Sequence, residues 1–577
     1  MHFKILYNKR MPFSNHEIAD ILRKFADLLE IHAENPYRIR AYRRAARSID
    51  KLDKNISQLI QEHVELTNLP NIGPGISRLI QEIIKTNKIP THVASQMKEK
   101  PFRNELLQIK GLGKKRIALL KNIGITTRDA LLKSIKTGAL RSNFSWVTSS
   151  FEEKLLHGIQ NPLPYEKFLR YEAAELIINF IKSTVESWPE VTEIIPTGSY
   201  RRKSELIGNV DWIIQTTHAT DVLQKISKMD IVKELISQDE KSISVILRSA
   251  LLMTFHVVQA SKKGRYLLGY TGSKAHVESL YQYAKSKNIT LEDDETFVGL
   301  TEKEIYAKLG LSYIEPELRE NRGEILAAQH NKLPHLICLE DIKGDLHSHT
   351  NETDGTEPLE VMVQAAIQRG YQYFAITDHS KRLTITNGLD EKRLLKQIEQ
   401  INLLNDKYPM ITILKSMEVD ILEDGSLDLS NEVLKELDIR VCSVHSKFKL
   451  PEEKQTERII RAMDNPYFNI LGHMTGRLLT SRSPYPLQIE KIFFAAKERN
   501  CFIEINSQPA RLDINDIYCK QAKEIGVKMA ISSDAHSTKG LSFMQYGVNQ
   551  ARRGWLEKSD VINTRSLADL LKLCKRN

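Results

Sequence analysis

The stretch GDLHSHTNETDG, residues 344–355, decides the fold expected for the C-terminal part of this chain. It closes a short β-rich run with His347 and His349 two positions apart, and Asp354 follows just downstream. Side chains two apart on a strand point to the same face, so both imidazoles lie on one side. This arrangement indicates a metal site at the end of a strand.

Six further β-rich runs continue this rhythm toward the end of the chain. They end at FAITDH, ILKSMEVD, IRVCSVHS, NILGHMTG, FIEINSQ and KMAISSDAH, and helical stretches of roughly ten or more residues separate them. Strands that alternate with helices predict a parallel sheet or barrel, here over residues 341–577. In such folds the functional side chains gather where the strands end.

All but one of these seven run ends carry side chains that ligate metals. The candidate ligands are His347, His349, Asp354, His379, Glu418, His445, His473, Asp534 and His536. Imidazole and carboxylate without thiolate suit Mn²⁺, Zn²⁺ or Fe²⁺, and the set exceeds one tetrahedral shell, so we expect a cluster of ions. Glu418 lies midway in this order and is the expected bridging carboxylate. The predicted chemistry is attack of metal-activated hydroxide on phosphorus, with His347, His349 and Glu418 as catalytic residues.

The composition is that of a soluble protein with several domains. A length of 577 residues suggests roughly three to four domains. Hydrophobic residues make up 41% and charged residues 27%, and we find no run of about 18 apolar residues that predicts a membrane span. MHFKILYNKR is too short and too polar for a cleavable signal. Five cysteines without a close pair argue against a disulfide framework, so we expect a cytoplasmic protein.

Basic residues concentrate near the N-terminus. The formal net charge of +10 is consistent with a polyanionic partner. In NPYRIRAYRRAARSI, helical spacing places Arg40, Arg43, Arg44 and Arg47 on one face, and residues 36–48 include no acid. A solvated helix face is the plainer interpretation, but an unneutralised row of arginines repels itself, and phosphates would relieve that repulsion.

Two Gly-x-Gly turns lie between apolar helices, in LPNIGPGISRLIQEII (69–84) and LLQIKGLGKKRIALLKNIGI (106–125). This helix-hairpin-helix pattern lets backbone N–H groups at a helix N-terminus approach a DNA phosphate. One such turn is also typical of a helix cap, but two copies beside basic helices favour non-specific binding of duplex DNA. The candidate DNA-binding residues are Gly73, Gly75, Gly111, Gly113, Lys114 and Lys115, together with the four arginines above.

Residues 161–326 have a mixed α/β pattern that includes TGSYRRKSELIGNVDWII (197–214). A turn of Gly198 and Ser199, followed by arginines and a short apolar strand ending in Asp211, suits a nucleotide phosphate and a metal. Metal-assisted phosphoryl transfer usually needs two carboxylates that flank one residue of a strand. Here Asn209 puts a neutral amide where the second carboxylate is expected.

These motifs together resemble bacterial and archaeal family X DNA polymerases (PolX) with a C-terminal polymerase-and-histidinol-phosphatase (PHP) domain. The resemblance extends from about residue 14 to residue 577, through NPYRIRAYRRAA, both hairpins, TGSYRR, YTGSK, PELRENRGEI and every PHP motif. It implies a nucleoid-associated base-excision-repair enzyme that acts as a monomer on gapped, nicked or 3′-ended DNA. The PHP domain implies Mn²⁺-dependent 3′–5′ exonuclease or 3′-end processing, on a distorted (β/α)₇ barrel with three ions.

The same resemblance divides the chain into domains of the α and α/β classes. We expect a helical domain with the first helix-hairpin-helix at 11–90, and a fingers-like helical domain with the second at 91–160. A nucleotidyltransferase-like palm and thumb follows at 161–326, then a linker at 327–340 and the PHP domain at 341–577.

The polymerase half departs from the family pattern. The family has Gly-Asp-x-Asp where residues 208–211 are Gly-Asn-Val-Asp, and its third aspartate aligns with Thr254. One carboxylate of three remains, which is too little negative charge to hold a pair of Mg²⁺ ions. We therefore expect polymerase activity to be lost or weak. The retained phosphate-binding pattern would then bind DNA ends or nucleotides, or only preserve the fold; it comprises Gly198, Ser199, Arg202, Gly272 and Ser273.

Other hypotheses stay open. A gap-filling polymerase with rearranged metal ligands would incorporate nucleotides and lose that activity on Asp211→Ala. A non-enzymatic scaffold would bind DNA without hydrolysing it. A small-molecule phosphatase would need neither the hairpins nor the basic helix, and tight, salt-sensitive DNA binding would exclude it.

Overall fold

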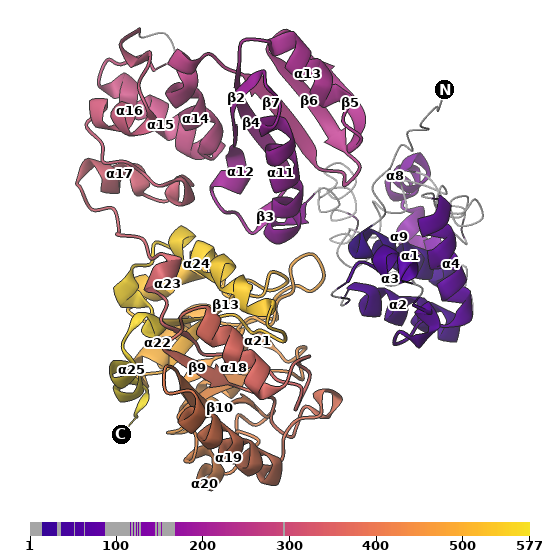
Figure 1. Cartoon of the computed structure of the whole chain (residues 1–577), viewed down its shortest axis with the longest axis vertical. Helices are drawn as coiled ribbons and strands as arrows, with labels where there is room; N and C mark the ends of the chain where they lie inside the picture. The colour runs from indigo at the N-terminus through magenta and orange to yellow at the C-terminus, as the bar shows by residue number, and fades with distance from the viewer. Residues whose placement is uncertain are drawn as a thin grey trace, which may run out of the picture. The chain divides into compact units, whose positions relative to one another are not determined.

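A computed structural model of the chain describes most of its residues (Figure 1). The described residues are 14–31, 36–50, 52, 54–62, 64–86, 116, 119, 120, 123, 125, 128–144, 147, 152, 168–291 and 295–576. The chain divides into two compact units, residues 1–165 and 166–577. Among the described residues, no helix is both long enough and apolar enough to cross a bilayer.

The described part of the N-terminal unit is helical, as expected. Its helices are α1 (Asn15–Ile31), α2 (Pro36–Asp50), α3 (Ile56–Gln61), α4 (Pro74–Thr86), α8 (Arg128–Lys136) and α9 (Ala139–Asn143). Helix α2 buries Tyr42, Ala45 and Ile49 at helical spacing against the core that α1 shares. The opposite side of α2 exposes Arg44 and Arg47 to solvent. The helix is therefore amphipathic, with an apolar side in the core and a basic side outside.

The second unit begins with a five-stranded mixed sheet, which forms the palm. The strand order is β2 (Val191–Pro196), β4 (Asn209–Thr216), β7 (Leu252–Val257), β6 (Ser242–Leu247) and β5 (Val232–Gln238). β4 and β7 are parallel, and the other neighbours are antiparallel. Helices α11 (Tyr171–Glu186) and α13 (Ala219–Ser227) lie against the sheet (Figure 1), and their apolar side chains share a buried cluster with Trp212 and Phe255. The short α12 (Gly198–Arg201) and an antiparallel pair, β1 (Leu169–Arg170) and β3 (Leu206–Ile207), complete the palm.

A helical thumb follows the palm sheet. It contains α14 (Lys263–Thr271), α15 (Lys274–Ser286), α16 (Glu302–Lys308) and α17 (Glu324–Gln329). Palm and thumb are joined by Glu302, whose carboxylate accepts hydrogen bonds from Arg201 at 2.5 Å and from Arg319 at 2.5 Å. Burial raises the pKa of Glu302, but Arg319 and Arg201 lower it below its usual value. This buried network fixes the thumb against the palm.

The C-terminal part forms a seven-stranded parallel sheet that is nearly closed into a barrel. Its strands are β8 (Gly344–Asp345), β9 (Tyr373–Ile376), β10 (Thr412–Asp420), β11 (Ile439–Ser443), β12 (Ile470–Leu471), β13 (Phe502–Asn506) and β14 (Met529–Ser532), in that order. The two edge strands meet just beyond their ends, where the backbone N–H of His349 donates to the carbonyl of Ala535 at 2.8 Å. The expected (β/α)₇ barrel is confirmed.

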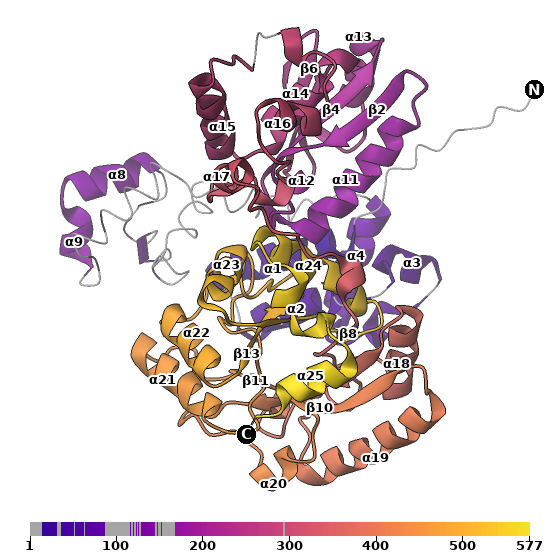
Figure 2. The same cartoon turned by 90° about the vertical axis from the view of Figure 1, so that its left-hand side faces the viewer.

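Helices surround this barrel, as Figure 2 shows. They are α18 (Leu359–Gln368), α19 (Glu391–Lys407), α20 (Asn431–Leu434), α21 (Glu452–Met463), α22 (Ile489–Glu498), α23 (Asp516–Ile525), α24 (Met544–Arg553) and α25 (Leu567–Cys574). Leu570 and Cys574 of α25 share an apolar cluster with Ile439 and Phe502, the first residues of β11 and β13. The N-terminal end of the barrel is therefore filled with apolar side chains, and the polar site lies at the opposite end.

Candidate metal centre and polymerase-like pocket

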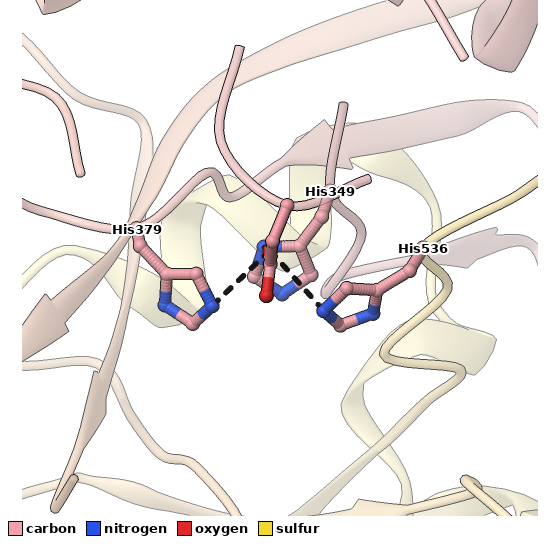
Figure 3. Close-up of side chains that lie close together, drawn as sticks. His349, His379 and His536 are labelled. Atoms are coloured by element: carbon pink, nitrogen blue, oxygen red, sulfur yellow. Dashed lines mark ion pairs between the residues drawn. The ribbon is translucent and has the colours of Figure 1, made fainter. Parts of the chain in front are cut away.

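The structure brings all of the predicted PHP ligands together at the C-terminal end of the barrel. Glu418 lies within β10 near its C-terminal end, the histidines and Asp534 follow the ends of their strands, and Asp354 lies farther downstream of β8. His347 and His349 therefore follow β8 and do not lie on it. All of the ligands except His473 form three overlapping groups, and within each group one nitrogen or oxygen atom of every residue lies within 4.8 Å of the others; His473 contacts Glu418. The groups are His349, Asp354, His379 and His536; His347, His349 and Asp534; and His379, Glu418 and His445. Figure 3 shows the rings of His349, His379 and His536 turned toward one shared space.

Glu418 lies at the centre of this arrangement. Its Oε1 is 2.9 Å from Nε2 of His473 and 3.2 Å from Nε2 of His445. Its Oε2 is 2.8 Å from Nδ1 of His379 and 3.5 Å from Nε2 of His347. Each carboxylate oxygen thus faces a different pair of imidazoles, which is the geometry a bridging carboxylate needs.

Several ring nitrogens of the site have no hydrogen-bond partner. His349 is fully buried, yet neither Nδ1 nor Nε2 makes a hydrogen bond, and Nε2 of His347 is in the same state. A buried polar atom left unpaired costs free energy, and a divalent cation that binds a neutral imidazole would satisfy it. Burial and the neighbouring His536 and His379 lower the pKa of His349 to about 3, so this ring is neutral. The residues therefore fit a metal cluster.

The carboxylates of the centre are held in the charged form. Burial raises the pKa of Glu418, but the imidazoles of His445, His379 and His347 lower it well below its usual range. The same balance, led by His347, lowers the pKa of Asp534. Both side chains can therefore act as anionic ligands at neutral pH.

A second layer of side chains orients these ligands. Oε1 of Glu504 lies 2.6 Å from Nδ1 of His347, and Oδ1 of Asp420 lies 3.2 Å from Nδ1 of His445. Asn506 donates to Oδ2 of Asp534 at 3.0 Å. Such contacts fix the tautomer and orientation of a metal-binding imidazole. Glu504 and Asn506 lie in FIEINSQ, the one run end where the sequence shows no ligand, and position in the strand is the only signal that could have identified them.

The polymerase-like pocket contains Asp211 beside an amide, a hydroxyl and an imidazole. Asp211 and Thr254 are register partners on the parallel strands β4 and β7. Nδ2 of Asn209 donates to Oδ2 of Asp211 at 3.2 Å, and Nε2 of His256 lies 3.4 Å from Oδ1. The His256 ring stacks on Tyr270 with centroids 4.2 Å apart. Within the described residues, no metal-binding group of three or more acidic, histidine or cysteine side chains lies in this pocket.

The predicted phosphate-binding residues border this pocket, but some already have partners within the chain. Gly198 has a positive φ of 64°, and a Cβ there would lie 3.7 Å from Oδ2 of Asp211. The hydroxyl of Ser199 is buried without a partner. Arg202, however, donates to Glu320 at 2.9 Å and to the carbonyl of Thr271 at 2.8 Å.

The other two predicted phosphate-binding residues shape the start of α15. Ser273 accepts a hydrogen bond from the backbone of His276 at 3.2 Å and so caps the helix. A Cβ on Gly272 would lie 2.7 Å from the His276 ring, so only glycine fits there. A nucleotide-binding role for these residues stays a prediction.

The predicted DNA-binding residues are described only in part. Arg44 and Arg47 are exposed on α2 and Arg43 is half-buried, while the Arg40 side chain lies outside the described residues. Gly73 precedes α4, and Gly75 lies in its first turn. Gly111, Gly113, Lys114 and Lys115 also lie outside the described residues, so the second hairpin stays a prediction.

Comparisons with known proteins agree with this architecture. A helix-hairpin-helix domain matches residues 13–89, a DNA polymerase beta thumb matches residues 266–320, and a PHP domain matches residues 345–508. The chain is 33% identical over 572 residues to the DNA polymerase/3′-5′ exonuclease PolX of Bacillus subtilis (strain 168), covering 97% of this chain and 99% of that protein. It is also 32% identical over 231 residues to a probable phosphatase of Thermoanaerobacter sp. (strain X514), covering 38% of this chain and 89% of that protein. The chain therefore belongs to the PolX family, the DNA polymerases of family X that carry a PHP domain.

Proposed function

We propose that this chain is a DNA-repair enzyme whose PHP centre removes nucleotides from 3′ ends by hydrolysis. The observation that carries the proposal is the cluster of imidazole and carboxylate side chains at the end of the barrel, in which buried ring nitrogens of His347 and His349 make no hydrogen bond. The Bacillus subtilis relative is named as both a DNA polymerase and a 3′-5′ exonuclease, and the similarity extends over nearly the whole of both chains. That extent supports the same exonuclease activity here.

We assign the centre to Mn²⁺, with Zn²⁺ or Fe²⁺ as alternatives, and to three ions. The three ligand groups would each hold one ion, with Glu418 facing two pairs of imidazoles. Bound ions of this kind supply a hydroxide nucleophile and neutralise charge at phosphorus. His349 contributes a neutral ring, Glu504 orients His347, and Asn506 orients Asp534.

Polymerase activity is proposed to be weak or lost, because Asp211 is accompanied by an amide, a hydroxyl and an imidazole instead of two carboxylates. The pocket offers one carboxylate to balance the charge of two divalent ions, and phosphoryl transfer depends on carboxylates that hold these ions in place. A working gap-filling polymerase is the second candidate function. The match to a polymerase thumb and the name of the Bacillus subtilis relative favour it.

Gapped, nicked or 3′-ended duplex DNA is the proposed substrate, bound by a monomer. The basic side of α2 and the matched helix-hairpin-helix domain support binding to the phosphate backbone. Such binding would be non-specific in sequence and would weaken steeply as salt is raised.

One labelled gapped duplex, incubated with Mn²⁺ with and without dNTPs, tests these functions. We expect the primer to shorten, EDTA to stop the reaction, and the variant H347A/H349A to leave the primer intact. Shortening that persists in this variant would contradict the assignment of the PHP centre. Steady lengthening that disappears in D211A would favour the polymerase, whereas DNA binding with neither reaction would leave only a scaffold.

A further inference from the structure

The palm turn that follows the phosphate-binding loop is packed against the barrel. The backbone carbonyl of Arg202 accepts a hydrogen bond from Arg553 of α24 at 2.8 Å. Three residues later, Glu205 faces the barrel with its carboxylate. The palm face that borders the Asp211 pocket thus continues directly into a face that contacts the barrel domain.

Glu205 forms a two-point ion pair with Arg477 of the PHP domain. NH1 of Arg477 donates to Oε1 of Glu205 at 3.2 Å, and NH2 donates to Oε2 at 2.6 Å. Gln550 adds a third hydrogen bond to Oε2 at 3.2 Å. Arg477 is buried, with 8% of its surface exposed, and burial makes the loss of a charged partner costly.

Arg477 ends the turn that carries the metal ligand His473. The turn is tight: the backbone N–H of Gly476 donates to the carbonyl of His473 at 2.9 Å, and Gly476 has a φ of 60°. NH2 of Arg477 also donates to the carbonyl of Leu512, and the next residue, Asp513, accepts from the backbone of Thr475 at 3.0 Å. Both sides of the turn are therefore tied down, one of them through the palm.

We propose that Glu205 is a positioning residue for the metal centre: by pairing with Arg477 it holds the turn that presents His473 to Glu418. The palm then contributes to the hydrolytic site without contributing chemistry. This inference rests on the proposed PHP metal centre. It also gives the palm a function that does not depend on its missing carboxylates.

Neutralising Glu205 would remove the carboxylate that pairs with the buried guanidinium of Arg477. Arg477 keeps its bond to Leu512, but within the described part of the chain Glu205 is the only carboxylate that forms an ion pair with its guanidinium. A buried guanidinium without its anion favours conformations that reach water, and those conformations move the turn. Substitution of a residue that hydrogen-bonds a metal ligand typically weakens metal binding by about 10- to 100-fold; Glu205 acts one contact further out, through Arg477, so we expect an effect at the low end of this range.

The test is a Mn²⁺ titration of the full-length chain, followed by the electron paramagnetic resonance signal of free Mn²⁺. The variants are E205Q, E205D and H473A, and the matched control is E317Q. Glu317 pairs at 2.8 Å with Arg552 of α24, the helix that also contributes Gln550 and Arg553 to the contacts described above. E317Q therefore removes a comparable ion pair that does not reach the His473 turn. Thermal unfolding of each variant checks that the fold is retained.

We expect E205Q to weaken the weakest Mn²⁺ site by about 10-fold, E205D to restore most of the affinity, and E317Q to match the parent. An E205Q titration identical to the parent, with H473A clearly weakened, would overturn the inference and leave the proposed function intact. Equal weakening by E317Q and E205Q would also overturn it, because any loss at the interface would then suffice. A parent chain that binds no Mn²⁺ would instead refute the metal centre itself.

Discussion

Returning the missing carboxylates to the palm tests whether charge limits the polymerase site. The perturbation is Asn209→Asp with Thr254→Asp. Thr254 is the register partner of Asp211, and Asn209 already contacts the Asp211 carboxylate at 3.2 Å. Neighbouring strands lie about 5 Å apart, so the double variant places each new carboxylate within about 5 Å of Asp211. The background H347A/H349A prevents primer shortening from masking extension.

The expected magnitude follows from these distances. Two carboxylates about 5 Å apart repel by about 1 to 3 kcal/mol for effective dielectric constants between about 80 and 20. The Asp211 side chain is 22% exposed, so solvent screens part of this repulsion. We expect the variant to be destabilised in EDTA and to regain stability with Mg²⁺. Removing one electrostatic catalytic group typically costs about 100-fold in rate, so we expect extension at least about 100-fold faster than in the parent.

The assay is extension of a 5′-labelled primer on a duplex with a one-nucleotide gap, with Mg²⁺ and dNTPs. The control is Thr254→Asn, which adds a side chain of similar size to aspartate without its charge. A parent that already extends the primer as fast as the variant would refute the reasoning. So would a variant that gains neither stability from Mg²⁺ nor extension, because charge would then not be the limiting factor.

Three further predictions follow from individual contacts. The pKa of Glu302 is lowered in the folded chain, so its ionised carboxylate stabilises the fold above about pH 4.5, and this stabilisation is lost as the pH falls toward the lowered pKa. E302Q should therefore cost about 3 kcal/mol of stability at pH 7, and the difference between E302Q and the parent in thermal unfolding should shrink below about pH 4.5. A difference that stays constant with pH would contradict the prediction. Gly476 has a positive φ, and a Cβ added there would lie 2.4 Å from the Tyr485 ring. G476A should therefore destabilise the fold by about 1 to 3 kcal/mol and weaken Mn²⁺ binding. Mn²⁺ titrations that match the parent would contradict this prediction. Arg44 and Arg47 are exposed on α2. R44A/R47A should therefore reduce the slope of log DNA affinity against log salt concentration by about 2, as measured by fluorescence anisotropy with a short duplex. An unchanged slope would show that these side chains do not contact phosphate.

The barrel and the clustering of its candidate ligands could be predicted because each strand carries its own signal. A β-rich run buried on both faces, followed by a histidine or an acid, marks both the strand and its functional end. His347 and Asp534 were identified in this way although the chain separates them widely. The orienting residues Glu504 and Asn506 were not identified, because an acid or amide inside a strand has no spacing that distinguishes a supporting role from a structural one.

Two features of the palm have no signal in the sequence: strand β5 and the ion pair between Glu205 and Arg477. Strand β5 was not predicted, since six of its seven side chains, from Lys233 to Gln238, are exposed and no apolar alternation marks it. The pairing of Glu205 with Arg477 joins residues 272 positions apart. Each is a charged residue in a polar stretch, and nothing local indicates its partner. Long-range ion pairs of this kind depend on the packing of whole domains, which periodicity does not specify.

The two faces of the palm segment respond to charge in opposite ways. Toward the pocket, Asn209 and Thr254 remove repulsion around Asp211, and in the absence of metal this makes the palm easier to fold. Toward the barrel, Glu205 compensates a buried arginine, and removing it would leave that charge unpaired. The palm can therefore lose its metal-binding carboxylates at little cost to the fold, but it cannot lose its contacts with the barrel as easily. A hydrolytic centre supported in this way depends on the palm as a folded structure and not on its catalysis.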